Sequence, residues 1–154
     1  MLGYGTANDI LYNNTKSQLM LFDTRMYNNY DDISLNDVTL KYVEKYKYLG
    51  HIITNKLSDD ADMKSKIDLL YARSNMLVRK FYFCSSAVKN RLFNSYCCNI
   101  YLCVLWRNFK TSSKNAVRVA YNNAFRIINN FSRRCSASGM FANNNVRSLI
   151  SRDV

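Results

Sequence analysis

The spacing of apolar positions along the chain changes near residue 58. Before that point, short apolar runs alternate with polar segments, and the runs cover residues 18–22, 38–42 and 46–54. β-Branched and aromatic residues in runs of this length predict strands, and Gly50 favours a small antiparallel hairpin. The polar, acidic segment of residues 23–37 is typical of a loop.

After residue 58 the apolar positions recur at intervals of three and four, which predicts helices. The first helix is expected to begin at Ser58, where a hydroxyl can accept a hydrogen bond from an unpaired backbone N–H. Three carboxylates that suit the positive end of the helix dipole follow in its first turn, namely Asp59, Asp60 and Asp62. The apolar face of this helix comprises Met63, Ile67, Leu70, Leu77 and Phe81.

Two more long helices and a short one are predicted further along the chain. The second helix is expected over residues 87–106 behind a cap at Ser85 or Ser86, and its apolar residues surround it, so it should be central. The third is expected to begin at Ser113 and to continue through Ile128. A linker rich in Ser and Arg over residues 132–139 then precedes a short helix over residues 146–150.

These elements predict an α+β fold that is mostly α. A small N-terminal antiparallel β part would occupy residues 1–57, a bundle of three to four helices would occupy residues 58–131, and a linker with a short helix would occupy residues 132–154. The absence of Pro and the presence of only 4 Gly favour long helices over turn-rich sandwiches or barrels.

The charge is distributed unevenly between the two halves of the chain. Residues 1–70 carry 8 Lys and Arg against 10 Asp and Glu, a net charge of −2, whereas residues 71–154 carry 14 Lys and Arg against Asp153 alone, a net charge of +13. Cations at this density repel one another unless a polyanion is nearby. Nucleic acid is the usual partner, with an anionic membrane surface and a solvated surface without a dedicated partner as alternatives.

The cysteine and histidine positions do not predict a metal centre. The 5 cysteines include no Cys-x-x-Cys pair, and the single histidine, His51, is far from all of them in sequence. Cys97 and Cys103 lie in apolar sequence and are expected to fill the core. No apolar run reaches the ~18 residues of a membrane span. No signal peptide is recognisable, so we expect an intracellular protein, cytoplasmic or nuclear, with no membrane partner.

Three cations on the first predicted helix are spaced by seven residues, and we call Lys66, Arg73 and Lys80 the basic line. Seven residues are close to two helical turns, so these side chains should lie in a row beside the apolar face. Such a row can follow a phosphate backbone while the helix stays anchored in the core, and it is equally compatible with an ordinary polar border. Lys64 and Arg79 fall off this line.

Several segments, taken in order, resemble one protein family. Residues 45–54, with the sequence Lys-Tyr-Lys-Tyr-Leu-Gly-His-Ile-Ile-Thr, are similar to the primer-grip hairpin of reverse transcriptases from LINE-type (non-LTR) retrotransposons. Upstream, residues 13–22 look like the Asn-x-x-Lys-Ser turn and palm strand that come before it. Downstream, residues 71–81 resemble the first thumb helix. Three later segments resemble stretches that follow the thumb, namely residues 96–106, 118–126 and 136–141.

The resemblance implies a role for each block. In that family the Tyr-Leu-Gly hairpin supports the 3′ end of the primer, so Tyr48, Leu49 and Gly50 are expected to contact it. The lysine of the Asn-x-x-Lys turn lies near the incoming nucleotide, and Lys16 occupies that position. The thumb helices contact the template–primer duplex, which favours phosphate contacts by the basic line.

The resemblance does not extend to catalysis. Polymerases of this class hold two metal ions with palm carboxylates that include an aromatic-x-Asp-Asp box, and that box should precede the Asn-x-x-Lys turn. Asp9 is the lone carboxylate there, while Asp31 and Asp32 follow the turn and have Asn29 where the aromatic residue belongs. We therefore predict no catalytic residues, no metal site and no cofactor in this chain, with Mg²⁺ expected only for the complete polymerase, and no nucleotide incorporation by the chain alone.

The sequence thus predicts a fragment of an RNA-directed DNA polymerase. Its partners would be template–primer nucleic acid and the fingers and palm portion of the polymerase, which this sequence lacks.

Two other classes of function stay open. One is a stand-alone nucleic-acid-binding module, whose affinity would depend on salt. The other is a helical structural or partner-binding domain with no nucleic-acid role, which would expose aromatic patches and associate without salt dependence.

Overall fold

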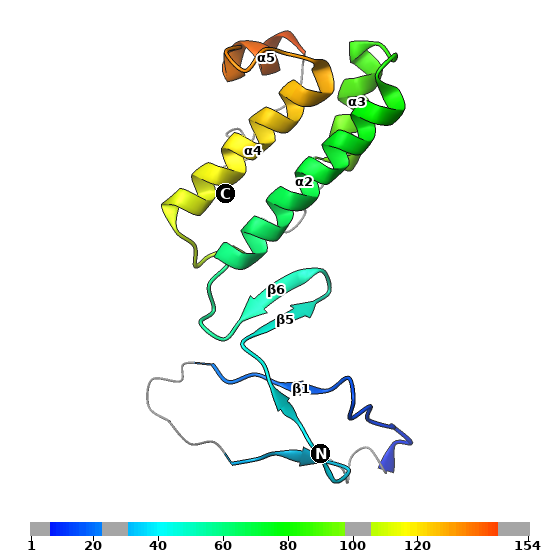
Figure 1. Ribbon diagram of the computed structural model, residues 1–154, viewed down its shortest axis with the longest axis vertical. Coiled ribbons are helices and arrows are strands. Elements are labelled where there is room, and N and C mark those ends of the chain that lie inside the picture. The colour runs from blue at the N-terminus through cyan, green and yellow to red at the C-terminus, as the bar shows by residue number, and fades with distance from the viewer. Residues whose placement is uncertain (1–6, 23–30, 98–105, 145–154) are drawn as a thin grey trace. The chain divides into compact units, whose positions relative to one another are not determined.

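A computed structural model of the protein describes residues 7–22, 31–97 and 106–144. The chain divides into two compact units, Met1–Ser58 and Asp59–Val154, and each is considered by itself. Short strands form the first unit and helices form the second (Figure 1). The predicted α+β fold, mostly α with a small β part, is confirmed.

The described part of the first unit contains three pairs of short strands. Strands β2 (Ser34–Leu35) and β3 (Val38–Thr39) are antiparallel, and so are β5 (Lys45–Tyr48) and β6 (His51–Thr54). Strand β1 (Gln18–Leu19) pairs in parallel with β4 (Lys41–Tyr42), so this part is not antiparallel throughout. A parallel pair needs a connection of a dozen or more residues, and residues 20–40 provide it.

In both antiparallel pairs, the two residues that connect the strands have positive φ, as a type I′ hairpin turn requires. Asn36 and Asp37 have φ of 49° and 62°, and Leu49 and Gly50 have φ of 47° and 85°. The loop predicted over residues 23–37 is wrong at its C-terminal end, where β2 forms a strand and an Asn-Asp turn connects it to β3. Residues 23–30 of this predicted loop lie outside the described residues. The strand predicted over residues 38–42 is divided between two partners, while residues 45–54 form a hairpin of their own.

The described part of the second unit contains four helices. They are α2 (Asp60–Phe81), α3 (Ser86–Tyr96), α4 (Thr111–Asn129) and α5 (Ala137–Asn143). Helices α2 and α4 lie side by side (Figure 1). The apolar face predicted for α2 turns inward, with Met63, Leu70 and Leu77 buried.

Aromatic rings from three helices meet in the core of this unit. The ring centroid of Phe93 on α3 lies 5.1 Å from that of Tyr121 and 5.0 Å from that of Phe125, both on α4. The ring of Phe141 on α5 lies 4.9 Å from Phe125 and 5.7 Å from Tyr121. Edge-to-face and offset contacts at these distances add to the free energy gained by burial, so they hold α3 and α5 against α4.

The start of α2 uses its carboxylates differently from the prediction. Its N-cap is Asp59 rather than the preceding serine, and the Asp59 side chain makes no capping bond. Instead, Asp59 Oδ2 accepts hydrogen bonds from the backbone N–H groups of Arg107 and Asn108, each at 2.8 Å. Asp60 Oδ1 accepts one from the backbone N–H of Lys110 at 3.0 Å. These two carboxylates therefore hold the segment that leads into α4 against the start of α2.

The second helix is shorter than predicted. Helix α3 ends at Tyr96, and residues 98–105 of the predicted span lie outside the described residues. The Val88 and Tyr96 side chains are exposed, so apolar contacts do not surround the helix. Trp106 lies outside the helix, where its indole Nε1 donates a 2.9 Å hydrogen bond to Asp62 Oδ2 at the start of α2. This bond holds Trp106 in the segment before α4, which is a tertiary constraint that local periodicity does not reveal.

The C-terminal elements also differ from the prediction. Helix α4 (Thr111–Asn129) begins before the predicted Ser113 and is followed by Asn130, a C-cap in the left-handed conformation. The predicted linker over residues 132–139 is interrupted because α5 begins at Ala137. Burial of Met140 and Phe141 explains α5, since tertiary packing outweighs the weak helix propensity of its Ser and Gly. The short helix predicted over residues 146–150 lies outside the described residues.

Candidate nucleic-acid interface

Lys16 belongs to a tight turn that leads into β1. Asn13 Oδ1 accepts hydrogen bonds from the Thr15 hydroxyl at 2.8 Å and from the Lys16 backbone N–H at 3.0 Å. The carbonyl of Asn13 accepts one from the Ser17 backbone N–H at 3.0 Å. The asparagine side chain thus replaces a backbone acceptor and closes the turn. The turn presents Lys16 as an exposed cation immediately before β1.

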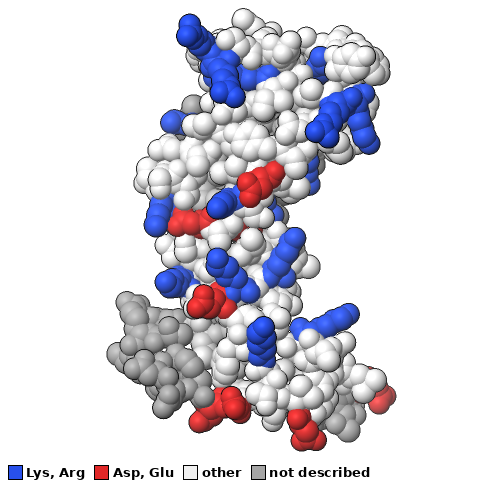
Figure 2. Space-filling view, in the orientation of Figure 1, with Lys and Arg blue, Asp and Glu red and all other residues white. Residues whose placement is uncertain are grey.

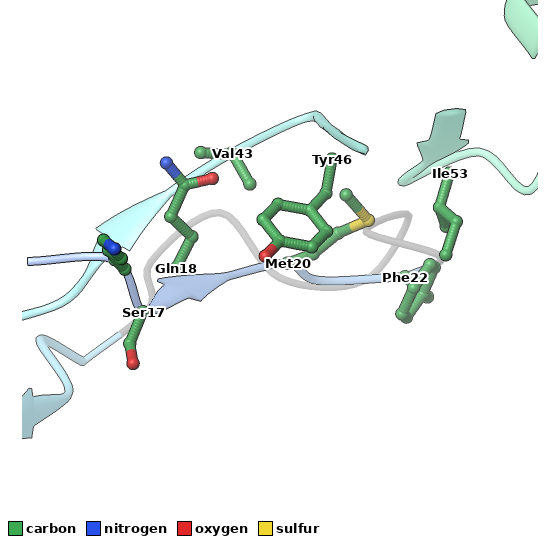
Figure 3. A pocket seen from close by; sticks show the side chains of 8 residues that line it. Ser17, Gln18, Met20, Phe22, Val43, Tyr46 and Ile53 are labelled. Atoms are coloured by element: carbon green, nitrogen blue, oxygen red, sulfur yellow. The ribbon is translucent and has the colours of Figure 1, made fainter. Parts of the chain in front are cut away.

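Figure 3 shows a pocket within the first unit. Its volume is about 370 Å³, and Lys16 is one of its lining residues. Side chains from β1, β5 and β6 line it as well, through Gln18, Tyr46 and Ile53 respectively. The structure therefore brings the Asn-x-x-Lys turn next to the base of the β5–β6 hairpin. Sequence spacing alone did not connect these two blocks.

The tip of the β5–β6 hairpin carries the three residues predicted to contact a primer. Tyr48 is 57% exposed and Leu49 is 81% exposed. No atom lies within 4 Å of a Cβ built on Gly50, so the φ of 85°, rather than close approach of another segment of this chain, explains the glycine. Tyr48 pairs with His51 across the turn, which places both side chains on the same face of the hairpin.

We expect Leu49→Asn to stabilise the hairpin. Leucine at a φ of 47° is strained by about 1–2 kcal/mol, whereas asparagine tolerates this conformation. The exposed leucine side chain also contributes little burial that could be lost. Amide hydrogen exchange in β5 and β6 should slow by about fivefold, the equivalent of about 1 kcal/mol. Unchanged or faster exchange would show that the leucine conformation costs nothing.

The basic line is less uniform than its spacing predicts. Lys80 is exposed, whereas Lys66 and Arg73 are half-buried. Arg73 Nη1 donates a 2.9 Å hydrogen bond to the carbonyl of Tyr96, at the C-terminal end of α3. A guanidinium suits that position because the carbonyls at a helix C-terminus carry partial negative charge. Arg73 therefore joins α2 to α3, a role that the sequence analysis missed.

A second row of cations follows α4. Lys110, Lys114 and Arg118 are spaced by four residues and are all exposed. Lys114 and Arg118 are four residues apart on α4 and so lie along one side of the helix. Lys110 is the N-cap of α4 and precedes its first turn. This row is the clearest candidate for phosphate contacts that sequence reasoning did not find.

Other polar side chains of the helical unit are bound internally. Arg126 Nη2 donates a 2.8 Å hydrogen bond to the carbonyl of Cys135, which fastens the segment after α4. Asn129 on α4 donates to Asn90 on α3, and Asn90 donates to Asn144 after α5, each at 3.1 Å. These bonds connect three helices, so we assign these groups to the fold and not to a ligand site.

Exposed cations are nevertheless widespread on the helical unit, and Figure 2 shows Lys and Arg side chains at several places on it. Three of its four described carboxylates accept hydrogen bonds from residues 106–110, namely Asp59, Asp60 and Asp62. The fourth, Asp68, is exposed. The surface of this unit therefore favours an anionic partner.

The described residues add little about metal or membrane chemistry. Within residues 7–22, 31–97 and 106–144, no group of three or more His, Cys, Asp or Glu side chains could hold a metal ion. Asp31 and Asp32 are exposed, while Asn29 lies outside these ranges. Cys97 is buried in the core as predicted, and Cys103 lies outside them. In the same part of the chain, no helix has the length and apolar character needed to span a bilayer.

Comparison with known proteins does not assign the chain. No protein-family model, curated protein or solved structure matches it. Two features of the molecule bear on its function, namely the exposed tip of the β5–β6 hairpin and the cations exposed on the helices.

Proposed function

We propose that this chain contributes primer-grip and thumb contacts to a template–primer duplex as part of an RNA-directed DNA polymerase of the non-LTR retrotransposon type. The hairpin tip would contact the primer terminus, and the helices would contact the phosphate backbone. The carboxylates that bind Mg²⁺ would belong to another portion of that polymerase. The chain alone would bind nucleic acid without extending it.

The conformation and exposure of Leu49 are the observation on which the proposal rests. A type I′ turn favours Asn, Asp or Gly at both central positions, and this chain places a leucine at the first of them. That leucine is 81% exposed, so burial within the chain does not offset its strain. Strained residues that the fold does not require are common at binding sites. An apolar tip beside Tyr48 suits contact with the sugar and base of a primer terminus.

The helical unit supports the second half of the proposal. Its surface cations include Lys80 on α2, Lys110 at the N-cap of α4, and Lys114 and Arg118 on α4. Phosphate contacts by such side chains release condensed counterions and bind duplexes of any sequence. Contacts of this kind fix position on a duplex without reading bases, which is what a thumb must do.

We expect Lys80→Ala to weaken duplex binding and to reduce its salt dependence. Each phosphate contact contributes about 0.9 to the slope of log affinity against log salt concentration, so the slope should become shallower by about that amount. The loss should be about equal for duplexes of different sequence. Fluorescence anisotropy with a labelled blunt duplex, repeated over a series of salt concentrations, measures both quantities.

Two further variants make this experiment specific. Lys64 is exposed on the same helix but lies off the basic line, so Lys64→Ala should change the slope by much less. Lys114→Ala tests the row on α4 in the same way. An equal loss from Lys64→Ala would leave only general charge attraction. A loss from Lys114→Ala with none from Lys80→Ala would assign the phosphate contacts to α4 and not to α2.

A further inference from the structure

Two adjacent aromatic side chains are exposed where α2 ends. Tyr82 is the C-cap of α2 and is 71% exposed, and Phe83 follows it and is 73% exposed. Their ring centroids lie 5.5 Å apart with an interplanar angle of 89°, so the rings meet edge to face. The preceding residue, Phe81, packs against the core and anchors the pair. Most of the surface of both rings therefore remains open to a ligand.

The immediate neighbours of this aromatic pair are cations. Arg79 and Lys80 lie in the last turn of α2 and are exposed. Tyr82 keeps helical backbone angles as the C-cap, so Arg79, three residues before it, is its neighbour on the helical surface. Phe83 follows directly, three residues after Lys80 in sequence. No acidic residue occurs anywhere between residues 69 and 152 of the sequence. The pair thus combines exposed ring surface with uncompensated positive charge.

We infer that Tyr82 and Phe83, together with Arg79 and Lys80, bind unpaired bases of single-stranded nucleic acid. The rings would stack on bases, and the two cations would contact the phosphates between them. Exposed aromatic rings beside cations bind single strands with little sequence preference, because every base offers a π-face. Bases within a duplex are already stacked on one another, so these rings would select single-stranded segments over the duplex that the basic line is proposed to contact.

The inference shares with the proposed function the assumption that the ligand is nucleic acid and the cation Lys80, so its test changes only the two rings. The full chain is titrated into a labelled single strand and, separately, into a blunt duplex. The variant is the double substitution Tyr82→Ala with Phe83→Ala. The matched control is Tyr96→Ala, because Tyr96 is a half-exposed aromatic residue of the same unit. Arg73 donates a hydrogen bond to the Tyr96 backbone carbonyl, which the alanine variant keeps. Circular dichroism verifies that all variants keep their helices.

The double variant should lose single-strand affinity by about tenfold for each ring, while duplex affinity changes by less than about twofold. The double substitution Tyr82→Trp with Phe83→Trp keeps two rings that can stack, so it should retain single-strand affinity. Tyr96→Ala should change neither the single-strand nor the duplex affinity. Unchanged single-strand affinity, or an equal loss for both ligands, would overturn the inference. Binding to single strands without binding to duplex would overturn the proposed function and leave the inference standing. A chain that binds neither ligand would overturn both and favour a protein partner for the rings.

Discussion

Replacing Phe125 with alanine is expected to lower the free energy of unfolding by about 3–5 kcal/mol, the usual cost of truncating a buried aromatic residue. The Phe125 side chain is fully buried, and its ring lies between Phe93 of α3 and Phe141 of α5. Its removal would leave a cavity where three helices meet. Because single domains are stable by only about 5–15 kcal/mol, the helical unit of this variant would be close to unfolding. Urea unfolding followed by circular dichroism measures the loss.

The control for Phe125→Ala lies on the same helix. Ile127 is 39% exposed, so Ile127→Ala should cost much less, on the order of 1 kcal/mol or below. Equal losses from the two variants would mean that the aromatic cluster is not the centre of this unit. A urea midpoint of unfolding that is unchanged in Phe125→Ala would contradict the buried position of this ring in the core.

Raising the salt concentration from about 50 to 200 mM should weaken duplex binding by about 40-fold. Three phosphate contacts give a slope of about −2.7 for log affinity against log salt concentration, and a fourfold increase in salt then produces this loss. The three contacts would be made by Lys80, Lys114 and Arg118, which are exposed, and further contacts by other exposed cations would make the dependence steeper. Anisotropy titrations at each salt concentration, with a labelled blunt duplex, provide the slope directly.

The opposite outcome of the salt series has a clear meaning. If no duplex binding is detected even at the lowest salt concentration, the helical unit does not bind nucleic acid. Binding whose affinity does not change with salt concentration would indicate apolar contacts, because phosphate contacts release counterions and are therefore weakened by salt. The chain would then be a structural or partner-binding helical domain, with the rings of Tyr82 and Phe83 as part of its contact surface.

The helices could be predicted from sequence because their local signals agree with their packing. The spacing of Met63, Leu70 and Leu77 marks the face of α2 that the structure buries. The hairpin over residues 45–54 was likewise visible, since Gly50 follows a run of strand-forming residues and the structure gives it a φ of 85°. In both cases neighbours in sequence determine the element.

The errors occur where distant residues decide the structure. The end of α3 could not be read from periodicity, since apolar residues continue past Tyr96 while Trp106 is bound to Asp62 on α2. Helix α5 was predicted as a linker because Ser and Gly lie at its start, whereas burial of Met140 and Phe141 stabilises it. Both outcomes depend on contacts between elements far apart in sequence.

The candidate site was also only partly predictable from the sequence. Spacing identified a row of cations on α2, but it could not show that Arg73 donates a hydrogen bond to the Tyr96 carbonyl. It also could not show that Lys16 shares a pocket with Tyr46, because residues 13–22 and 45–54 meet only in the folded unit. The exposure of Leu49 likewise emerged only from the structure, since its sequence context suits a buried strand end equally well.

Photocrosslinking from position 48 tests the central proposal most directly. Tyr48 would be replaced by a photoreactive benzophenone amino acid, and the protein would be irradiated on a template–primer duplex with a recessed primer 3′ end. The primer-grip proposal predicts crosslinks concentrated at the terminal nucleotides of the primer. The same amino acid at position 96, outside the hairpin, should give no such preference. Crosslinks spread evenly along the duplex, or an equal pattern from both positions, would contradict the proposal.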